Sequence, residues 1–242
     1  MQPLLIAHRC GPILYPEQSI ASAQHALRCH ADMVEMDVQF TSDGVPVICH
    51  DLNTQRVFGV DCLVRDMSYE TFMTLRHVED RSYASHSLDD VLSVGIAPLL
   101  LHQKLSGEPL REVMRHLLTF DYGDKAVIGV QYPQDVELVK SMSPSTRTLA
   151  FMPELSLLEA FLPTRTDAIR LWEEWVTPER IARIHQTGHQ VWIMAGFPTP
   201  EGVGYTTEEK MRMWVKMGVD GILVNDVPWA DGILHGKENE TK

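Results

Sequence analysis

The chain has 242 residues, 44% of them hydrophobic, and 33 acidic side chains outnumber 21 basic ones to give a formal net charge of -12. This length is close to the ~250 residues typical of one α/β barrel, and the apolar fraction excludes a disordered chain. The net acidity argues against nucleic acid or an anionic membrane surface as a partner, because attraction to phosphates needs basic patches. It leaves open a small anionic substrate held in one cleft by a few cations or by a metal.

Cysteine spacing and the first residues of the chain bear on its compartment. The four cysteines, at positions 10, 29, 49 and 62, lack a Cys-x-x-Cys pair and predict reduced thiols rather than a disulfide framework. The opening segment MQPLLIAHRC has no basic region, and its apolar run is too short for a secretory signal. Other apolar runs fall far short of the ~18 residues that span a bilayer. We therefore expect a soluble, cytoplasmic protein without a membrane span.

Short apolar runs alternate with helical patterns along the chain. Residues 4–7 predict a buried strand, and Pro16 begins a helical pattern that continues to about residue 30. Residues 33–40 alternate apolar and polar side chains, and a turn at Asp43-Gly44 joins them to an extended run at 45–50 as a hairpin. Further strands are predicted, with helical patterns between them, at 98–104, 126–131, 147–151, 167–172, 190–196 and 221–226. One of these helices has Thr177 as its N-cap and Pro178 at its first position.

The count of strands and helices indicates the fold class. Eight parallel-type strands with helices between them are typical of a closed (β/α)8 TIM barrel, here with a hairpin arm after strand 2. An open doubly wound sheet has the same alternation, but no glycine-rich phosphate loop follows the first strand. Residues from about 52 to 87 are irregular and are interpreted as a short insertion. We expect one barrel over residues 1–236 and a disordered polar tail at 237–242.

Two carboxylates, Glu35 and Asp37, lie on one face of the second predicted strand. Their side chains are ~6–7 Å apart along the strand, at the barrel end where catalytic residues gather. Carboxylates this close repel each other unless a cation or a shared proton intervenes. Oxygen ligands of this kind suit a hard divalent cation such as Mg²⁺ or Ca²⁺. A solvated strand edge is the alternative interpretation.

Basic side chains occur at the same strand ends. His8 and His50 are candidates for proton transfer because histidine titrates near neutral pH, although a lone histidine at a strand end is more often a structural hydrogen-bonding group. Arg9 and Lys104 bring the positive charge that an anionic substrate requires. Each of these two could instead be an ion-pair partner for a carboxylate.

The segment IAHRCG, followed by YPEQS and by VEMDVQFTSDGVPVICHD, resembles the opening of the glycerophosphodiester phosphodiesterase family. The family pattern is His-Arg-Gly-Gly, Pro-Glu-Asn, Glu-x-Asp and, after a Lys-Asp-Gly turn, His-Asp. Weaker similarity continues to MGVDGILVNDVP near the end of the chain. The resemblance implies a barrel of the phosphatidylinositol-phospholipase-C-like type, with the insertion over its mouth. It also implies His8 and His50 as an acid–base pair, Arg9 facing the phosphate, and Glu35 and Asp37 as metal ligands.

The third-strand motif departs from the family, which has Ile-Glu-x-Lys where this chain has Leu101-His102-Gln103-Lys104. His102 thus replaces a carboxylate that is a further metal ligand in the family. The lost charge weakens the hold on a hard cation, and neutral imidazole suits Mn²⁺ or Zn²⁺ better than Ca²⁺. We expect Mg²⁺ or Ca²⁺ on Glu35 and Asp37, and Mn²⁺ or Zn²⁺ if His102 is also a ligand. Cys10, at a family glycine, is interpreted as a buried thiol rather than a nucleophile.

Three functions are compatible with these residues. The first is metal-dependent hydrolysis of glycerophosphodiesters, which are small-molecule substrates, to glycerol 3-phosphate and an alcohol, in lipid and glycerol metabolism. One histidine would deprotonate the attacking hydroxyl and the other would protonate the leaving oxygen. The second, motivated by the missing carboxylate, is a catalytically weakened barrel that binds a phosphoester as a sensor or carrier. The third is a lyase or transferase acting on a related phosphodiester, which would differ only in its products.

Overall fold

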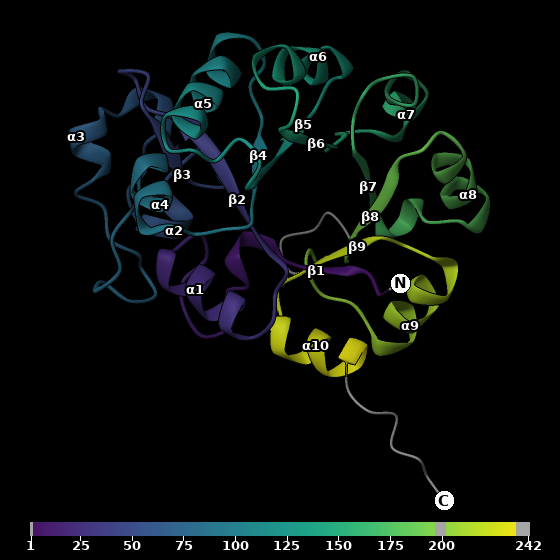
Figure 1. Ribbon diagram of the computed structural model, residues 1–242. Coiled ribbons are helices and arrows are strands. Elements are labelled where there is room, and N and C mark those ends of the chain that lie inside the picture. Colours follow the sequence, from purple (N-terminus) through teal and green to yellow (C-terminus); the bar gives the residue numbers. More distant parts are fainter. Residues whose placement is uncertain (1, 197–201, 236–242) are drawn as a thin grey trace, which may run out of the picture.

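The computed structural model describes residues 2–196 and 202–235 and shows a ring of strands surrounded by helices (Figure 1). The strands are β1 (Leu4–Ala7), β2 (Met33–Phe40), β3 (Pro46–Ile48), β4 (Leu99–Gln103), β5 (Ala126–Val130), β6 (Arg147–Ala150), β7 (Ala168–Trp172), β8 (Gln190–Met194) and β9 (Gly221–Val224). The α-helices are α1 (Ile20–Arg28), α2 (Gln55–Phe58), α3 (Tyr69–Phe72), α4 (Leu88–Val94), α5 (Glu108–Thr119), α6 (Pro133–Met142), α7 (Leu158–Phe161), α8 (Pro178–Gln186), α9 (Glu208–Met217) and α10 (Val227–His235). Short 3₁₀ turns are η1 (His8–Cys10), η2 (Val64–Asp66), η3 (Leu155–Leu157) and η4 (Glu173–Trp175).

Pairing of the first strand with both of its neighbours closes the sheet. The strand order is β1-β9-β8-β7-β6-β5-β4-β2-β3, and β1 also pairs with β2 in parallel. An open doubly wound sheet would leave β1 and β2 apart, so this closure excludes it. The strand β3 runs antiparallel to β2 as the expected hairpin arm. The predicted (β/α)8 TIM barrel is confirmed.

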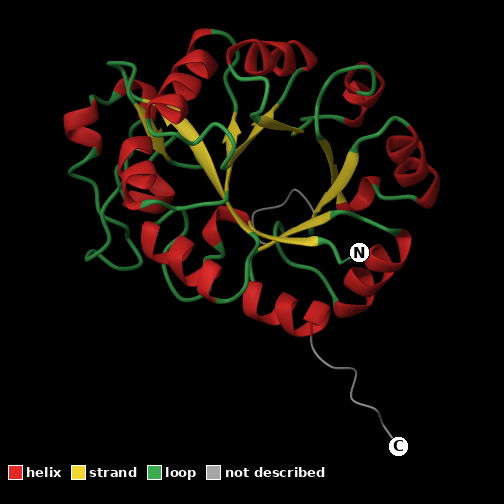
Figure 2. Ribbon diagram, in the orientation of Figure 1, coloured by secondary structure: helices red, strands yellow, loops and turns green. Residues whose placement is uncertain are grey.

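Alternation along the strands divides their side chains between two apolar layers. Outward side chains pack beneath the helices, which surround the ring of strands in Figure 2. Inward side chains fill the interior of the barrel with a second cluster: Ile6, Met33, Leu100, Val127, Leu149, Phe151, Ala168, Trp192, Met194 and Leu223. This interior cluster is apolar, so core packing does not explain the polar side chains that also point inward.

One predicted helix start differs from the structure and one agrees with it. The prediction that a helix begins at Pro16 is wrong, because Ser19 is the N-cap of α1 and its hydroxyl accepts a hydrogen bond from Ser22 N at 3.1 Å. Gln18, just before the cap, has a φ of 60°, which no right-handed helix contains. The predicted start of α8 is confirmed, with Thr177 as N-cap and Pro178 at the first position.

The insertion at 52–87 is more ordered than its sequence suggests. It contains α2, η2 and α3, and with β3 it encloses a small apolar cluster of Val47, Cys49, Val57, Phe58, Val64, Met67, Phe72 and Leu75. Figure 1 shows these elements outside the barrel, beside β3. The two ends of the insertion are joined, because Val47 bridges to Ser87 and Ile48 N donates to His86 O at 3.0 Å.

Two expectations about the whole chain concern its cysteines and membrane spans. All four cysteines are free, as predicted. Among the described residues, no helix is long and apolar enough to cross a membrane. The tail expected at 237–242 lies outside the described residues.

Candidate active site

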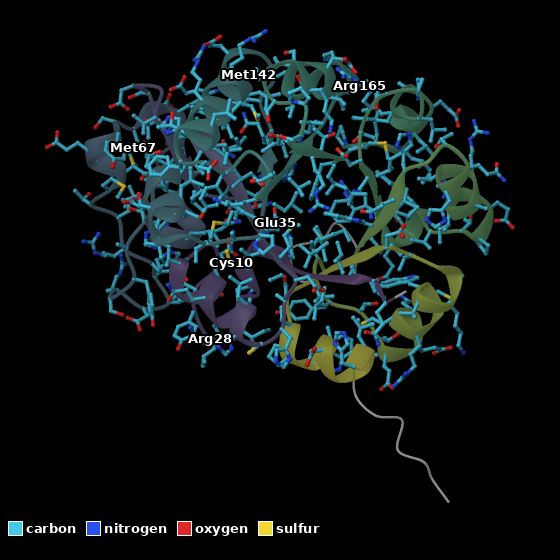
Figure 3. The ribbon with its side chains drawn as sticks, viewed as in Figure 1. Cys10, Arg28, Glu35, Met67, Met142 and Arg165 are labelled. Carbon is cyan, nitrogen blue, oxygen red and sulfur yellow. The ribbon has the colours of Figure 1, made fainter. Side chains whose placement is uncertain are left out.

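A cleft of about 730 Å³ lies at the carboxyl ends of the barrel strands, and Figure 3 shows Glu35 near the centre of the ring. Its polar lining residues come from β2, β4 and β7, from the segments that follow β1, β3, β5, β8 and β9, and from the insertion. They are His8, Arg9, Glu17, Glu35, Asp37, His50, Asp51, Arg56, Glu79, His102, Gln131, Arg170, Tyr205 and Asn225. Its apolar wall includes Phe151, Pro153, Trp172, Met194 and Val203.

Asp37 has three side-chain partners in the cleft. Its Oδ2 accepts a hydrogen bond from Gln18 Nε2 at 2.7 Å. Its Oδ1 lies 2.9 Å from Lys104 Nζ and 2.9 Å from His102 Nδ1. Burial raises the pKa of Asp37, but the Lys104 ammonium and the hydrogen bond from His102 outweigh burial and hold that pKa well below its usual range. Asp37 is therefore ionised, and its charge is balanced within the chain.

Glu35, two residues earlier on β2, has fewer partners. Its Oε2 accepts one hydrogen bond, from Arg9 N at 2.7 Å, and the side chain is 1% exposed. Burial, together with the negative charge of Asp37, raises the pKa of Glu35 to about 8. In the absence of a cation, Glu35 is thus protonated at neutral pH.

His102 has one ring nitrogen bonded to Asp37 and one without a partner among the described residues. It is opposite Asp37 in the β2–β4 register, and its Nδ1 bonds Asp37, so its Nε2 carries the lone pair. That Nε2 is buried and has no hydrogen-bond partner among the described residues. The ring stacks on Phe151 with centroids 3.9 Å apart, and burial lowers the pKa of His102 to about 4, which keeps it neutral. A neutral imidazole with an unused nitrogen is a suitable metal ligand.

Glu35, Asp37 and His102 together form a candidate metal site. Each offers one ligand atom, these atoms lie within 4.8 Å of one another, and all three residues are buried. A divalent cation would give His102 Nε2 a partner and would balance the negative charge of ionised Glu35. Two oxygens and one nitrogen form a donor set that suits Mn²⁺ or Zn²⁺ as well as Mg²⁺.

His8 is fixed in one tautomer by a short chain of hydrogen bonds. Asn225 Nδ2 donates to Val203 O at 3.0 Å, so Asn225 Oδ1 faces His8 Nδ1 at 2.7 Å and accepts its proton. Asn225 is itself held by its backbone N–H, which donates to Gly204 O at 2.8 Å. His8 Nε2 is therefore left as an acceptor. Burial and the nearby Arg9 guanidinium lower the pKa of His8 to about 3, so the imidazole is neutral.

His50 has a carboxylate partner on the next residue. Its Nδ1 donates to Asp51 Oδ1 at 2.6 Å, and its Nε2 accepts from Arg9 Nη2 at 2.9 Å. Arg56, from the insertion, contacts Asp51 at 2.6 Å and Glu17 at 2.6 and 2.9 Å. This network orients His50, and the Arg9 guanidinium, which also contacts Glu17 at 3.4 Å, lines the cleft beside it.

A strained turn after β1 places these groups. Arg9 and Cys10 have φ values of 47° and 70°, in the left-handed region that side chains other than glycine rarely adopt. The turn points Arg9 N toward Glu35 and buries Cys10, whose Sγ donates to Glu35 O at 3.6 Å. Burial raises the pKa of Cys10 well above its usual range, so it is a protonated thiol, which supports the buried-thiol interpretation.

The structure brings the sequence-predicted residues together around one cleft. His8, Arg9, Glu35, Asp37, His50 and His102 line it. Lys104 does not line it; its Nζ contacts Asp37 and donates to His50 O at 2.7 Å. Four residues with clear partners or positions in the site had no role assigned from sequence: Gln18, Asp51, Arg170 and Asn225. Of these, Asp51 and Asn225 follow strand ends and Arg170 is a charged residue within the predicted strand 167–172, which was a signal available from the sequence.

A family model described as the glycerophosphoryl diester phosphodiesterase family matches residues 8–143, which include both histidines and the three candidate metal ligands. The chain belongs to this family. The glycerophosphodiester phosphodiesterase of Caldanaerobacter subterraneus subsp. tengcongensis is 24% identical over 245 residues, covering 93% of this chain and 95% of that protein. A glycerophosphodiester phosphodiesterase of Bacillus altitudinis is 35% identical over 96 residues, covering 40% of this chain and 36% of its own.

Solved structures agree with the barrel fold. A phosphodiesterase of Oleispira antarctica, solved in complex with the product sn-glycerol-3-phosphate, matches with a TM-score of 0.80 at 17% identity and covers 97% of each chain. A putative glycerophosphoryl diester phosphodiesterase of Silicibacter pomeroyi matches with a TM-score of 0.79 at 20% identity, covering 97% of this chain and 93% of that one. These likenesses concern the fold.

Replacing Gly204 by Ala tests how Asn225 is held. Gly204 has a φ of +85°, and a Cβ there would lie 2.2 Å from Asn225 Oδ1, so the variant must displace the Asn225 side chain. We expect unfolding in urea to show a larger loss of stability than the ~1 kcal/mol typical of glycine replacement at positive φ. Imidazole ¹⁵N NMR should show that His8 loses its single tautomer. Gly218→Ala is the control, because Gly218 has a φ of +81° with open space around it. Equal stability losses in the two variants would contradict this account.

Replacing Glu35 by Gln tests the electrostatics of the buried pair in metal-free protein, with a chelator present. Glu35 has a folded pKa of about 8, above its unfolded value of 4.5, so the wild-type protein loses stability as pH rises between these values. The free energy of unfolding of Glu35→Gln should therefore increasingly exceed that of wild type from pH 5 to pH 8 and then level off. Glu174→Gln, which changes an exposed carboxylate, is the control. If the difference in unfolding free energy instead narrows as pH rises, the pKa of Glu35 is not raised in the folded protein.

Proposed function

We propose that this protein hydrolyses glycerophosphodiesters to glycerol 3-phosphate and an alcohol, using a divalent cation and the histidine pair His8 and His50. One observation carries the proposal: a three-residue candidate metal site and two imidazoles line the same cleft. The protonated nitrogen of each imidazole is bonded to a neighbouring side chain, Asn225 for His8 and Asp51 for His50. Family membership and the product named for the Oleispira antarctica phosphodiesterase support this substrate class.

Glu35, Asp37 and His102 would hold the cation. A divalent cation at this position supplies Lewis-acid stabilisation of the negative charge on the phosphate. The retained Lys104 keeps Asp37 ionised and fixed, which makes it a positioning residue for the site in this proposal. Gln18 has the same effect from the opposite side of the carboxylate, with hydrogen bonds to both Asp37 Oδ2 and Asp37 N.

The histidines would transfer the protons. His50 has the Nδ1–H bonded to Asp51, an arrangement that orients the ring and stabilises an imidazolium. Its Nε2 accepts from Arg9 Nη2 in this structure, so it would take a proton after Arg9 has turned to the phosphate. His8 is neutral in its buried position, but a phosphate anion bound beside it would raise its pKa and let it carry a proton to the leaving oxygen. Arg9, beside His50, would contact the phosphate.

We also infer a cytoplasmic location. Its support is the set of four free cysteines, two of them buried, which is usual for proteins of a reducing compartment.

Turnover in ¹⁸O-water tests the reaction. With Mg²⁺, Ca²⁺, Mn²⁺ or Zn²⁺ present, a panel of glycerophosphodiesters should give glycerol 3-phosphate that carries ¹⁸O on phosphorus. His50→Ala should lower kcat by ~10²- to 10⁴-fold, because it removes the proton acceptor. His235→Ala, at an exposed position at the end of α10, should retain wild-type rates. Release of a cyclic phosphate without ¹⁸O would indicate a lyase, and failure to release glycerol 3-phosphate with any cation would refute hydrolysis of this substrate class.

Calorimetric titration tests the metal site apart from turnover. Wild-type protein should bind Mn²⁺ at one site, and His102→Ala should weaken binding at least ~10-fold because a ligand nitrogen is lost. Affinity should rise with pH, since Glu35 must lose its proton to bind the cation. His185→Ala removes an exposed histidine on α8 and is the control. Unchanged affinity in His102→Ala would show that His102 is not a ligand.

A further inference from the structure

Arg170 is a buried cation that the chain itself leaves largely without partners. It lies on β7, lines the cleft and is 2% exposed. Its Nη2 donates to Met152 O at 2.8 Å, whereas Nε and Nη1 are buried and have no hydrogen-bond partner among the described residues. Aromatic rings surround it: its Cζ is 4.2 Å from the ring centroid of Trp172, 4.6 Å from that of Phe151 and 5.6 Å from that of Trp175.

A buried guanidinium of this kind lowers the stability of the folded protein unless an anion pairs with it. A buried charge without a counter-ion is strongly unfavourable, and aromatic faces offset only part of that cost. Burial lowers the pKa of Arg170 to about 9, so the guanidinium is still charged at neutral pH. In this dry setting, the attraction to an anion that enters the cleft is stronger than it would be in water. Arg170 therefore has the properties of an unused anion-binding group.

Arg170 approaches the candidate metal site from the opposite wall of the barrel. In the closed ring, three strands lie between β7 and β2 on either side, so Arg170 and the pair Glu35 and Asp37 start from opposite walls. Phe151 connects the two regions, because its ring centroid lies within 5 Å of both the His102 ring and the Arg170 guanidinium. A molecule whose phosphate is held near His102 thus has its attached group directed along Phe151 toward Arg170.

We propose that Arg170 binds a carboxylate on the substrate, so that the protein selects phosphodiesters whose alcohol part carries a carboxylate, such as a serine head group. This inference rests on the proposed function, because it assumes that a phosphodiester occupies the cleft. A carboxylate suits this guanidinium: it brings one negative charge to one cation, and it can accept a hydrogen bond from a nitrogen that has no partner within the described residues. A cationic head group would instead meet like charge at this wall.

Two matched pairs of compounds test the wild-type protein. Glycerophosphoserine and glycerophosphoethanolamine differ only by the carboxylate, and so do phosphoserine and phosphoethanolamine. We expect kcat/KM to favour glycerophosphoserine at least ~10-fold, and calorimetry to give phosphoserine a Kd at least ~10-fold lower, as a charged hydrogen bond in a buried site predicts. A ratio near one in both assays would overturn the proposal without any variant.

Variants connect the preference to Arg170. Arg170→Gln keeps a donor for Met152 O but removes the charge, and it should reduce both ratios at least ~10-fold. Arg170→Lys keeps the positive charge but places it on an ammonium, and it should reduce both ratios less. Arg165→Gln removes an exposed arginine that pairs with Glu137 and should leave both ratios as in wild type. Circular dichroism establishes that each variant is folded.

The outcomes separate the two proposals. If neither diester is turned over but phosphoserine binds with an Arg170-dependent preference, the hydrolase proposal fails and the carboxylate site stands. If turnover occurs and the serine preference survives in Arg170→Gln, the carboxylate site is refuted and the hydrolase stands. If Arg170→Gln does not fold, the wild-type ratio and its change in Arg170→Lys decide, and an unchanged ratio in that variant refutes the site.

Discussion

Two carboxylates on one face of a barrel strand set the electrostatic condition for the whole site. Glu35 and Asp37 are both buried, and a dry interior does not hold two neighbouring negative charges without cations. The chain supplies an ammonium, an imidazole and an amide to Asp37 but only a backbone N–H to Glu35. Asp37 is therefore neutralised by the chain, whereas Glu35 is neutral only because it holds a proton. A divalent ion from solution would balance the negative charge of Glu35 once that carboxyl has lost its proton.

The histidine at position 102 changes the other side of the cleft as well. A carboxylate there would lie next to Phe151 and would attract the guanidinium of Arg170 from the far side of that ring. Neutral imidazole exerts no such pull, so Arg170 keeps its two free nitrogens. With a neutral side chain at position 102, the charge of Arg170 is available elsewhere in the same cleft.

Sequence patterns predicted the barrel, the hairpin and the cluster of His8, Glu35, His50 and His102, because strand alternation and strand-end position are local properties. They did not predict where α1 begins, since the Ser19 cap and the left-handed Gln18 outweigh the preference of proline for a first turn. The short helices of the insertion have too few residues for a period to show. The roles of Asn225 and Arg170 depend on contacts that are distant in sequence. Asn225 faces a histidine 217 residues away. Two nitrogens of Arg170 lack partners because no acceptor among the described residues lies near them.

The hairpin arm has a consequence for how the cleft can be remodelled. His50 follows β3, and the insertion leaves the barrel directly after it, yet the chain returns to the same short strand through the Val47–Ser87 bridge. The insertion is therefore a loop with its two ends pinned side by side. Residues can therefore be added to or removed from its exposed turns at little entropic cost. Its apolar cluster and Arg56 are under a different constraint, because Arg56 contacts Asp51, the partner of His50. Cleft shape is thus open to change only in the parts of the insertion that do not support the histidine.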